Sequence, residues 1–494
     1  MMSMNSPFIP SRFETNHCIT LHGQKIDFTA IAEDFVFYGE DTLPEASLFS
    51  YTYLRRNVKS EGRPVIFAWN GGPGSCCIME HTAFFGPWRI PENELLKTLP
   101  PFTLEENPNC LLDRCDIVLI DPVDTGYGRL INRDRACYYF SIAGDAKATA
   151  DFIEAWLTKY DRWNSPIYLM GESYGTIRCA RVAEELNGGT LYKNGRHRSI
   201  AVSGMVLIGN ATWLPTEGVT PEENAMDRIV PEGTQAAVLL LPTMAAANWY
   251  HHPERQTESL DDFCDKAYAW AWNTLEPVLS GSKSVTDQEK KTIAEEMSSF
   301  TGIACEKLLE KNLDFCQAGE FAETLLAEKG LDIGTYDARM TLAHSDKIGV
   351  PDPAGDDPAM AVYSVSMTAV ANSILKKKLN ISFDRPFISV NFGANALWDF
   401  RAPEMLVPEI PPKTHIECLV SAMRRNPSMN LLIANGAYDL CTWTGLNRYL
   451  AETSGFPEKR TFVKMYPAGH AAFTGDAAGK MFRSDIEEFV LKHD

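Results

Sequence analysis

The chain lacks an excess of basic residues. Its 494 residues include 46 Lys and Arg against 65 Asp and Glu, so the formal net charge is −19 at pH 7. Proteins that bind nucleic acid or anionic membranes need a basic surface, and this composition argues against both classes of partner. Solubility is the simplest explanation of the acidity.

Three further features are missing. The chain has no run of 18 or more consecutive apolar residues, so the sequence predicts no membrane span. The first 23 residues have no basic start followed by an apolar stretch, so we expect no secretory signal. The twelve cysteines include no C-x-x-C pair, which argues against a zinc site or a thioredoxin-type site. We therefore expect mostly reduced cysteines, a cytoplasmic location, and neither metal nor cofactor.

Short apolar runs that end in turn-rich loops are the main structural signal. They are typical of strands covered on both faces of a parallel sheet. The six runs lie at 64–70, 116–121, 166–170, 204–210, 430–436 and 461–467. Helical patterns separate several of them, and residues 17–60 are typical of an antiparallel edge. The sequence thus predicts an α/β fold with a mostly parallel central sheet and helices on both faces.

The long interval between the fourth and fifth runs has no comparable strands. It favours helices instead, and Thr286 with Glu289 has the spacing of a capping box. We expect residues 213–385 to form a mostly helical cap insertion. Residues 17–212 and 386–494 are expected to form the core, with 386–429 left unassigned in secondary structure.

Ser173 lies between two glycines in GESYG, where the third apolar run turns into a helical pattern. Gly-x-Ser-x-Gly in that context is typical of a nucleophile elbow, in which a strained turn exposes the serine hydroxyl. Glycines on both sides allow close approach of neighbouring backbone. The alternative is a structural serine in a tight turn.

A reactive serine needs a base and a third group that orients the base. Asp439 follows the fifth apolar run, and His470 follows the sixth beside a glycine. The chain order Ser, Asp, His is the one expected for this kind of sheet. The sequence therefore predicts a triad of Ser173, Asp439 and His470.

The reaction also needs backbone N–H groups that face the developing oxyanion. Tyr174 directly follows the nucleophile, and the loop after the first run offers Gly71 and Gly72. A glycine-rich loop can instead cradle phosphate. This one lacks the Gly-Lys-Ser/Thr ending and carries a proline, so nucleotide binding is disfavoured.

Five motifs in order now resemble the serine carboxypeptidases, a branch of the α/β-hydrolase fold. They are WNGGPGS, DPVDTGYG, GESYG, the Asp439 loop and AGH. The likeness runs from about residue 20 to the end and is nearest to bacterial members without a signal. It implies Ser173, Asp439 and His470 as the triad, with Gly72 and Tyr174 donating to the oxyanion.

The resemblance also implies how a chain end is recognised. Asn70 and Glu172 are expected to hold the terminal carboxylate of a peptide substrate. Two carboxyl groups in contact cannot both ionise, so one proton must be shared between them. Binding is therefore expected to be best under acidic conditions.

Three positions depart from the family pattern. A second glutamate is usual shortly before the GP that follows the glycine loop, and Phe84 stands there. Glu80 lies four residues earlier and is not expected to reach the site. Asp124 replaces a usual glycine and adds a charge near the pocket, and AAF follows His470 in place of a methionine-bearing sequence.

Three hypotheses follow. The leading one is a serine carboxypeptidase that releases C-terminal amino acids from peptides through an acyl-enzyme. The second is an esterase or acyltransferase with the same triad, motivated by the missing glutamate at Phe84. The third is a hydrolase fold retained as a binding module, against which the complete triad argues. Side-chain preference and oligomeric state stay open.

Overall fold

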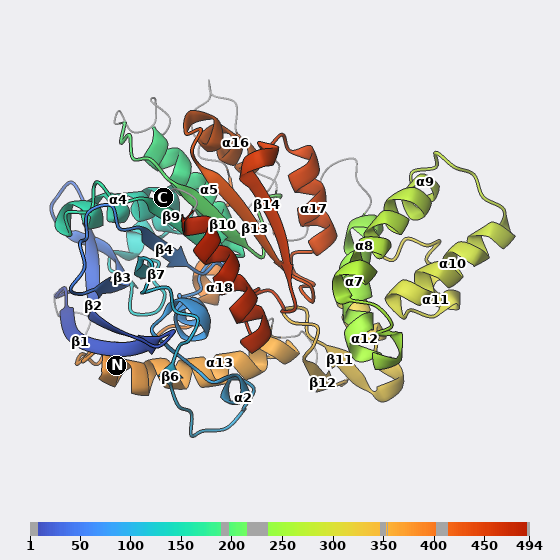
Figure 1. Ribbon diagram of the computed structural model, residues 1–494, viewed down its shortest axis with the longest axis horizontal. Coiled ribbons are helices and arrows are strands. Elements are labelled where there is room, and N and C mark those ends of the chain that lie inside the picture. The colour runs from blue at the N-terminus through green and yellow to red at the C-terminus, as the bar shows by residue number, and fades with distance from the viewer. Residues whose placement is uncertain are drawn as a thin grey trace.

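The computed structural model describes residues 8–188, 197–214, 236–345, 352, 354–401 and 413–491. One large sheet organises it, with strand order β1-β2-β3-β7-β4-β9-β10-β13-β14 (Figure 1). The antiparallel edge is β1 (Arg12–Leu21), β2 (Gln24–Tyr38) and β3 (Pro44–Arg55). The parallel part is β4 (Val65–Trp69), β7 (Asp116–Asp121), β9 (Ile167–Glu172), β10 (Gly204–Ile208), β13 (Asn430–Gly436) and β14 (Thr461–Tyr466).

The six apolar runs therefore all form strands of this sheet, as predicted, and residues 17–60 form its antiparallel edge. Successive strand residues enter opposite apolar layers because side chains alternate across a strand. Val65, Phe67 and Trp69 belong to one buried cluster, and Ile66 and Ala68 belong to another. Both faces of the sheet are covered.

Three helices cover the first face. They are α4 (Ile142–Lys159), α5 (Tyr174–Asn187) and α16 (His415–Arg425). One of them, α5, directly follows a strand. The opposite face carries α1 (Ile78–Glu80), α13 (Pro358–Val370) and α18 (Asp476–Leu491). Short helices α2 (Glu92–Leu95), α3 (Ala136–Tyr139), α14 (Lys376–Lys378), α15 (Phe392–Ala396) and α17 (Thr444–Thr453) complete this region.

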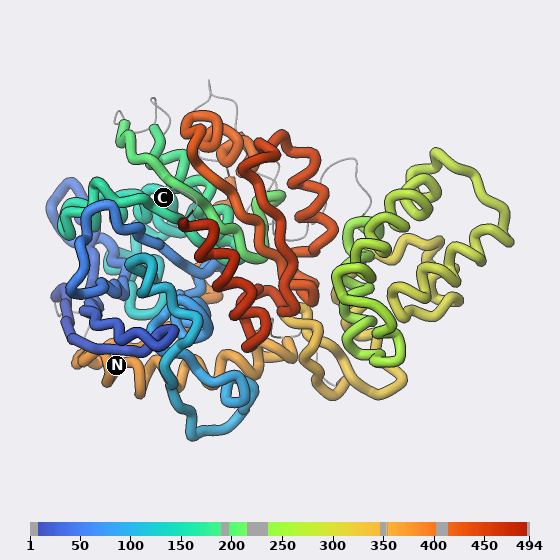
Figure 2. Tube along the Cα trace, in the orientation of Figure 1, coloured from blue at the N-terminus to red at the C-terminus, as the bar shows by residue number. Residues whose placement is uncertain are grey.

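Between β10 and β13 the described residues add no strand to the main sheet. They form α7 (Ala236–His251), α8 (Leu260–Trp270), α9 (Glu276–Leu279), α10 (Asp287–Thr301), α11 (Cys305–Glu310) and α12 (Ala318–Thr324). These helices make a lobe beside the sheet (Figure 2). The capping box of Thr286 and Glu289 is present at α10, as predicted.

The same interval also returns to the core. A small hairpin of β11 (Leu331–Ile333) and β12 (Thr341–Ala343) follows the lobe, and α13 then runs under the sheet (Figure 1). Tyr363 and Met367 of α13 are buried in the same cluster as Ile66 of β4. The described part of 213–385 thus has two locations: the helices α7 to α12 form the lobe, and α13 packs against the sheet. Residues 215–235, 346–351 and 353 of this interval are not among those the structure describes. The division into core and cap stays a prediction.

One stretch, Pro358–Lys378, is long and apolar enough to span a membrane by length and composition alone. It includes α13, and Tyr363, Met367 and Val370 on one side of it are buried against the sheet. Packing against the core accounts for this apolar composition.

Candidate active site

Ser173 occupies the sharp turn between β9 and α5. Its backbone has φ 58° and ψ −127°, a strained conformation for a residue with a Cβ. The turn is held by the Ser173 N–H, which donates to the Ile208 carbonyl at 2.9 Å, and by the Thr176 N–H, which donates to the Ser173 carbonyl at 2.9 Å. The expected elbow is therefore present.

The flanking glycines are needed because neighbouring backbone lies so close. A Cβ on Gly171 would lie 2.1 Å from the Gly175 carbonyl oxygen and 2.8 Å from Trp69 Nε1. A Cβ on Gly175 would lie 2.9 Å from the Asn70 carbonyl oxygen. Gly171 lets the two ends of the elbow approach each other and Trp69 of β4, and Gly175 packs the elbow against Asn70 in the loop after β4. A larger residue at either position would force these segments apart.

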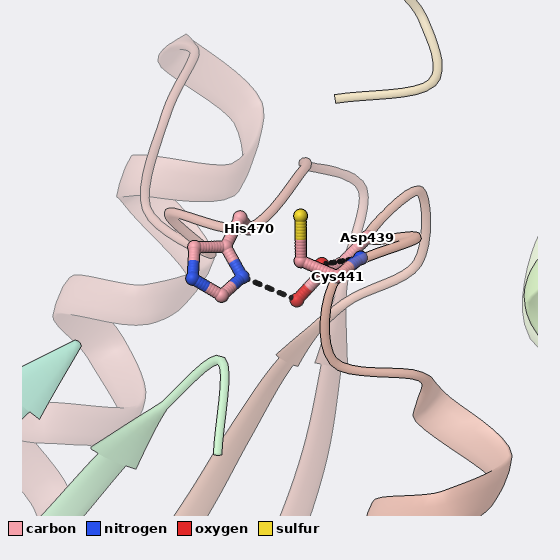
Figure 3. A group of neighbouring side chains, drawn as sticks. All are labelled: Asp439, Cys441 and His470. Atoms are coloured by element: carbon pink, nitrogen blue, oxygen red, sulfur yellow. Dashed lines mark hydrogen bonds and ion pairs between the residues drawn. The ribbon is translucent and has the colours of Figure 1, made fainter. Parts of the chain in front are cut away.

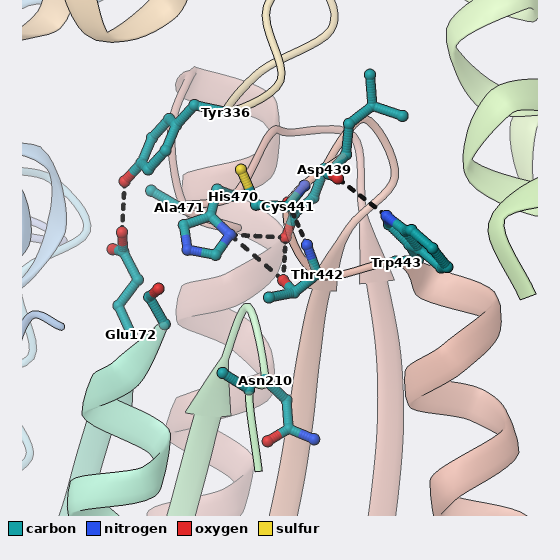
Figure 4. A network of polar contacts seen from close by, with 12 residues as sticks. Glu172, Asn210, Tyr336, Asp439, Cys441, Thr442, Trp443, His470 and Ala471 are labelled. Atoms are coloured by element: carbon teal, nitrogen blue, oxygen red, sulfur yellow. Dashed lines mark hydrogen bonds and ion pairs between the residues drawn. The ribbon is translucent and has the colours of Figure 1, made fainter. Parts of the chain in front are cut away.

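Asp439 and His470 follow β13 and β14 and lie side by side. His470 Nδ1 is 2.8 Å from Asp439 Oδ2, and both side chains are almost fully buried, at 3% and 0% exposure (Figure 4). The N–H groups of Cys441 and Thr442 donate to Asp439 Oδ1 at 2.8 and 2.9 Å, and the Thr442 hydroxyl donates to Oδ2. These donors fix the carboxylate that faces the imidazole.

The charges around His470 favour its protonated form. Burial alone lowers the pKa of His470, but the Asp439 carboxylate and, more weakly, Glu172 outweigh burial and raise the pKa above its ordinary value. An imidazole paired in this way is a good general base once neutral, because the nearby carboxylate stabilises the imidazolium that forms. The pair has the geometry of the base and orienting acid of a triad.

Asp439, Cys441 and His470 also place three potential metal-binding atoms within 4.8 Å of one another (Figure 3). Their chemistry fits a metal poorly. Asp439 already accepts four hydrogen bonds, and burial raises the pKa of the Cys441 thiol well above its usual range, which keeps the thiol protonated. The arrangement favours a hydrogen-bonded pair.

Ser173 and His470 line the same cavity, whose volume is about 240 Å³. Among the hydrogen bonds of the described residues, none joins the Ser173 hydroxyl to the His470 ring. Such bonds are often long without substrate and tighten only in the complex. The cavity also contains Asn70, Gly72 and Glu172, so it collects the residues expected for catalysis with those expected for carboxylate binding.

The two expected oxyanion donors come from segments that pack against each other, since a Cβ on Gly71 would lie 2.5 Å from the Tyr174 N. Tyr174 is the first residue of α5, and Gly72 lines the cavity from the loop after β4. Neither N–H donates to another group in the described part of the chain, whereas the Gly71 N–H donates to Asn70 Oδ1. Gly72 and Tyr174 therefore offer free donors, and Gly71 does not.

The backbone of Asn70 is held by a buried guanidinium group, that of Arg178. Arg178 Nη1 donates to the Asn70 carbonyl at 2.6 Å, and Arg178 Nε donates to the Asp145 carboxylate at 2.8 Å. The Tyr174 hydroxyl donates to the same carboxylate at 3.2 Å. Arg178 and Asp145 thus tie the Asn70 loop to the first turns of α4 and α5.

The structure corrects the expectation for Glu80. Asn70 Nδ2 donates to Glu80 Oε1 at 2.9 Å, and the Glu80 carboxyl contacts that of Glu172. Both are buried, at 1% exposure. Burial raises the pKa of Glu80 well above its ordinary value and also raises that of Glu172. The Glu172 carboxylate raises the pKa of Glu80 further, whereas the hydrogen bond from Glu80 lowers that of Glu172. One proton shared between them satisfies this contact.

The expected position of the second glutamate, Phe84, is part of the core instead. Its ring packs against Phe473 and Phe482 at centroid distances of 5.6 and 4.8 Å. Counting along the chain misled the prediction because residues 78–85 form tight helical turns, including a π-helical turn at His81–Phe85, which bring Glu80 to face Asn70. Phe473 belongs to the unusual AAF segment, so two departures from the family pattern meet in one aromatic cluster.

Asp124 does not add a charge to the cavity either. Its backbone has φ 62°, the left-handed region where glycine is usual. Its carboxylate accepts from the Leu130 N–H at 3.2 Å and from Asn391 Nδ2 at 2.9 Å, and it does not line the cavity. Asp124 therefore stabilises its own turn.

Tyr336 is a site residue that the sequence reasoning missed. It follows β11, and its hydroxyl donates to Glu172 Oε1 (Figure 4). Its ring also packs edge-on against His470, with the centroids 4.9 Å apart. The contact joins positions 164 residues apart. The surrounding segment TYDARMTL also resembles the serine carboxypeptidases, but that likeness did not indicate that its tyrosine reaches Glu172.

Comparisons with known proteins point to one family. A family model described as "Serine carboxypeptidase" matches residues 35–481. The pheromone-processing carboxypeptidase kex1 of Aspergillus niger is 28% identical over 182 residues, 36% of this chain and 27% of that protein. Carboxypeptidase sxa2 of Schizosaccharomyces pombe is 31% identical over 147 residues, 29% of this chain and 26% of that protein. The matched stretches thus span only about a quarter of these relatives.

A solved structure is similar over most of its length. It is Kex1(delta)p, a prohormone-processing carboxypeptidase from Saccharomyces cerevisiae, with a TM-score of 0.52 and 14% identity. The alignment covers 94% of this chain and 90% of that one. At this identity the likeness concerns the fold, and with the mostly parallel sheet it establishes the predicted α/β-hydrolase fold.

The expectation of a cytoplasmic location is wrong. Two of these similar proteins are named for processing a pheromone and a prohormone, which are peptides made for secretion. That expectation came from the start of the chain and from its cysteines. All twelve cysteines are free in the structure.

Proposed function

The chain belongs to the serine carboxypeptidase family, and from that membership we propose that it releases C-terminal amino acids from peptides through an acyl-enzyme at Ser173. One observation carries the proposal. The cavity that contains Ser173 and His470 also contains Glu172, whose buried carboxyl contacts that of Glu80. A carboxyl group that keeps its proton beside the nucleophile is suited to binding the free carboxylate of a chain end.

The triad would act as follows. His470 takes the Ser173 proton as the hydroxyl attacks the carbonyl of the last peptide bond, while Asp439 stabilises the imidazolium. The Gly72 and Tyr174 N–H groups donate to the oxyanion, a contribution on the order of 3–4 kcal/mol per donor. His470 then protonates the departing amino acid, and water, deprotonated by His470, releases the shortened peptide.

The carboxyl pair would select a chain end. A terminal carboxylate beside Glu172 and Asn70 needs hydrogen-bond donors. The proton between Glu80 and Glu172 is already engaged, so a chain end binds with a second proton, which is held between Glu172 and the terminal carboxylate. Once both glutamates ionise, the substrate carboxylate meets like charges and binding weakens. The carboxyl pair thus gives a physical reason for the carboxylate-binding roles that the family resemblance implies for Asn70 and Glu172. It also gives Glu80 a part in the same binding site.

We also propose residues 213–385 as a cap over the core formed by 17–212 and 386–494. Tyr336, Met360, Tyr363 and Met367 all come from this segment and line the cavity. The predictions of no nucleic-acid partner, no membrane partner and no cofactor stay predictions.

The test is direct. Purified protein incubated with blocked dipeptides from pH 4 to pH 8 is expected to release the free C-terminal amino acid, with the lowest KM at acidic pH. Folded protein that releases no amino acid at any pH would end the peptidase proposal. An esterase or acyltransferase with the same triad was motivated by Phe84, and the position of Glu80 removes that motivation.

A further inference from the structure

The segment at Thr335 and Tyr336 connects the two loops that carry Asp439 and His470. The Leu440 N–H donates to the Thr335 carbonyl at 3.0 Å, and the His470 N–H donates to the Tyr336 carbonyl at 2.7 Å. This segment belongs to the interval between β10 and β13, far from both loops in the chain. Its backbone is therefore part of the framework of the site.

Asp357 anchors the same segment from the other side. One oxygen, Oδ2, accepts from the Thr335 N–H at 2.7 Å, the Thr335 hydroxyl at 2.9 Å and the Tyr336 N–H at 3.2 Å. The other, Oδ1, caps α13 by accepting from the Ala359 and Met360 N–H groups. The backbone of Tyr336 is thus fixed, which directs its side chain into the cavity.

The Tyr336 hydroxyl completes the hydrogen bonds of the carboxyl pair. Asn70 donates to Glu80 Oε1, and Tyr336 donates to Glu172 Oε1. The remaining oxygens, Glu80 Oε2 and Glu172 Oε2, are buried and meet no other donor among the described residues. A proton between the two carboxyl groups fills this gap. Each carboxyl therefore has one neutral donor and one share of the common proton.

We propose that Tyr336 is a positioning residue for recognition of the substrate's C-terminal carboxylate: it holds the Glu172 carboxyl in place and helps to set the pH range in which that carboxyl binds a chain end. The inference rests on the proposed carboxypeptidase function. Under this proposal, the segment that contains Tyr336 contributes to binding the substrate's C-terminal carboxylate as well as to enclosing the cavity.

The charges that face Glu172 fix the expected direction of the pH effect. They are the carboxyl of Glu80, the ring of His470 and, behind it, the carboxylate of Asp439, while Cys441 lies near Tyr336. Burial raises the pKa of Glu172, and the Tyr336 hydroxyl opposes this by stabilising the ionised form. Without the Tyr336 hydroxyl, the Glu80–Glu172 pair keeps its proton to a higher pH. Glu172 also loses the hydrogen bond that holds its carboxyl group in position.

Tyr336→Phe removes the hydroxyl and keeps the ring against His470. A matched control is Tyr466→Phe, because Tyr466 is also buried and donates to a carboxylate, Asp485 at 2.9 Å, outside the cavity. We would measure kcat and KM from pH 4 to pH 8 for a blocked dipeptide and for a blocked amino-acid ethyl ester, whose leaving group has no carboxylate. A fluorophosphonate titration of Ser173 would count the intact sites.

For Tyr336→Phe we expect peptide KM to rise about tenfold at pH 5 with kcat within threefold, since one hydrogen bond to a carboxyl is lost. The pH at which peptide KM begins to rise should move upward, and ester kinetics should match the wild type. Tyr466→Phe should change neither. Peptide KM within twofold of the wild type, or equal losses on peptide and ester, would overturn the inference alone. A wild-type protein without peptide turnover would overturn the proposed function and this inference together.

Discussion

At the scale of single residues, the proposed reaction depends on buried or strained groups that the surrounding structure holds in place. Glu80 and Glu172 are both buried and share a contact that is tolerable only with a proton between them. Ser173 keeps a positive φ because the surrounding backbone holds the turn. These residues lower stability in favour of function, which is usual at active sites.

Glu80→Gln tests the shared proton. The introduced amide would donate permanently to Glu172 and remove a like charge, so the pKa of Glu172 should fall. The proton that a bound chain end needs would then be lost at lower pH. We expect peptide KM at pH 7 to rise by about tenfold, which corresponds to a pKa change of roughly one unit. Steady-state kinetics on a blocked dipeptide and an ethyl ester would measure it.

The control for that variant is Glu33→Gln, because Glu33 is also buried but lies in β2, where it accepts from Tyr160 and Lys159. It should leave both KM values unchanged. Equal losses on peptide and ester in Glu80→Gln would contradict the shared-proton account.

At the scale of elements, the site depends on the close packing of the loop after β4 against the β9–α5 turn. A Cβ on Gly71 would lie 2.5 Å from the Tyr174 N, 2.6 Å from the Glu172 carbonyl oxygen and 2.8 Å from the Gly175 N. All three are backbone atoms, so no side-chain movement relieves the overlap. Gly72, the next residue, offers an oxyanion donor, and its placement follows from this contact.

Gly71→Ala should therefore separate the two oxyanion donors. Losing one such donor costs about 10²–10³-fold in kcat, and we expect a loss of at least a hundredfold on peptide and ester alike. Gly319→Ala in α12 is the matched control, since no atom lies within 4 Å of the added Cβ. A Gly71→Ala protein with kcat within fivefold of the wild type would show that the contact does not position the donors.

The elements and the site were predictable to different degrees. Continuous apolar runs predicted the six strands because burial on both faces leaves a strong local signal, and Thr286 predicted the start of α10 through its cap. Ser173, Asp439 and His470 could be predicted as a triad because strand ends meet at one edge of a parallel sheet, and the structure places His470 against Asp439. Glu80 and Tyr336 escaped, since a helical turn in one case and a contact across 164 residues in the other brought them to the cavity.

At the scale of the whole molecule, the cavity gathers residues from the loops after β4, β9, β13 and β14 and from the cap segment. In the proposed reaction, two titrations act in opposite directions. His470 must be neutral to accept the Ser173 proton, and its pKa is raised. The carboxyl pair must keep a proton to bind a chain end, and the pKa of each member is raised as well.

The pH profiles of peptide and ester hydrolysis should therefore differ. As the pH falls through the pKa of His470, kcat/KM should fall for both substrates. As the pH rises through the pKa of the carboxyl pair, KM should rise for peptides alone. We expect a bell-shaped profile for a blocked dipeptide and a single acidic limb for an ethyl ester, measured from pH 4 to pH 9. Identical pH profiles for the dipeptide and the ester would contradict binding of the substrate carboxylate by a protonated Glu80–Glu172 pair.

The central claim is that His470 activates the Ser173 hydroxyl. Labelling with a fluorophosphonate, followed by peptide mapping, tests it most directly. The account predicts that Ser173 is the labelled residue, that Ser173→Ala abolishes labelling, and that His470→Ala slows it by at least a thousandfold. A label on another residue, or His470→Ala protein that is labelled as fast as the wild type, would contradict the account.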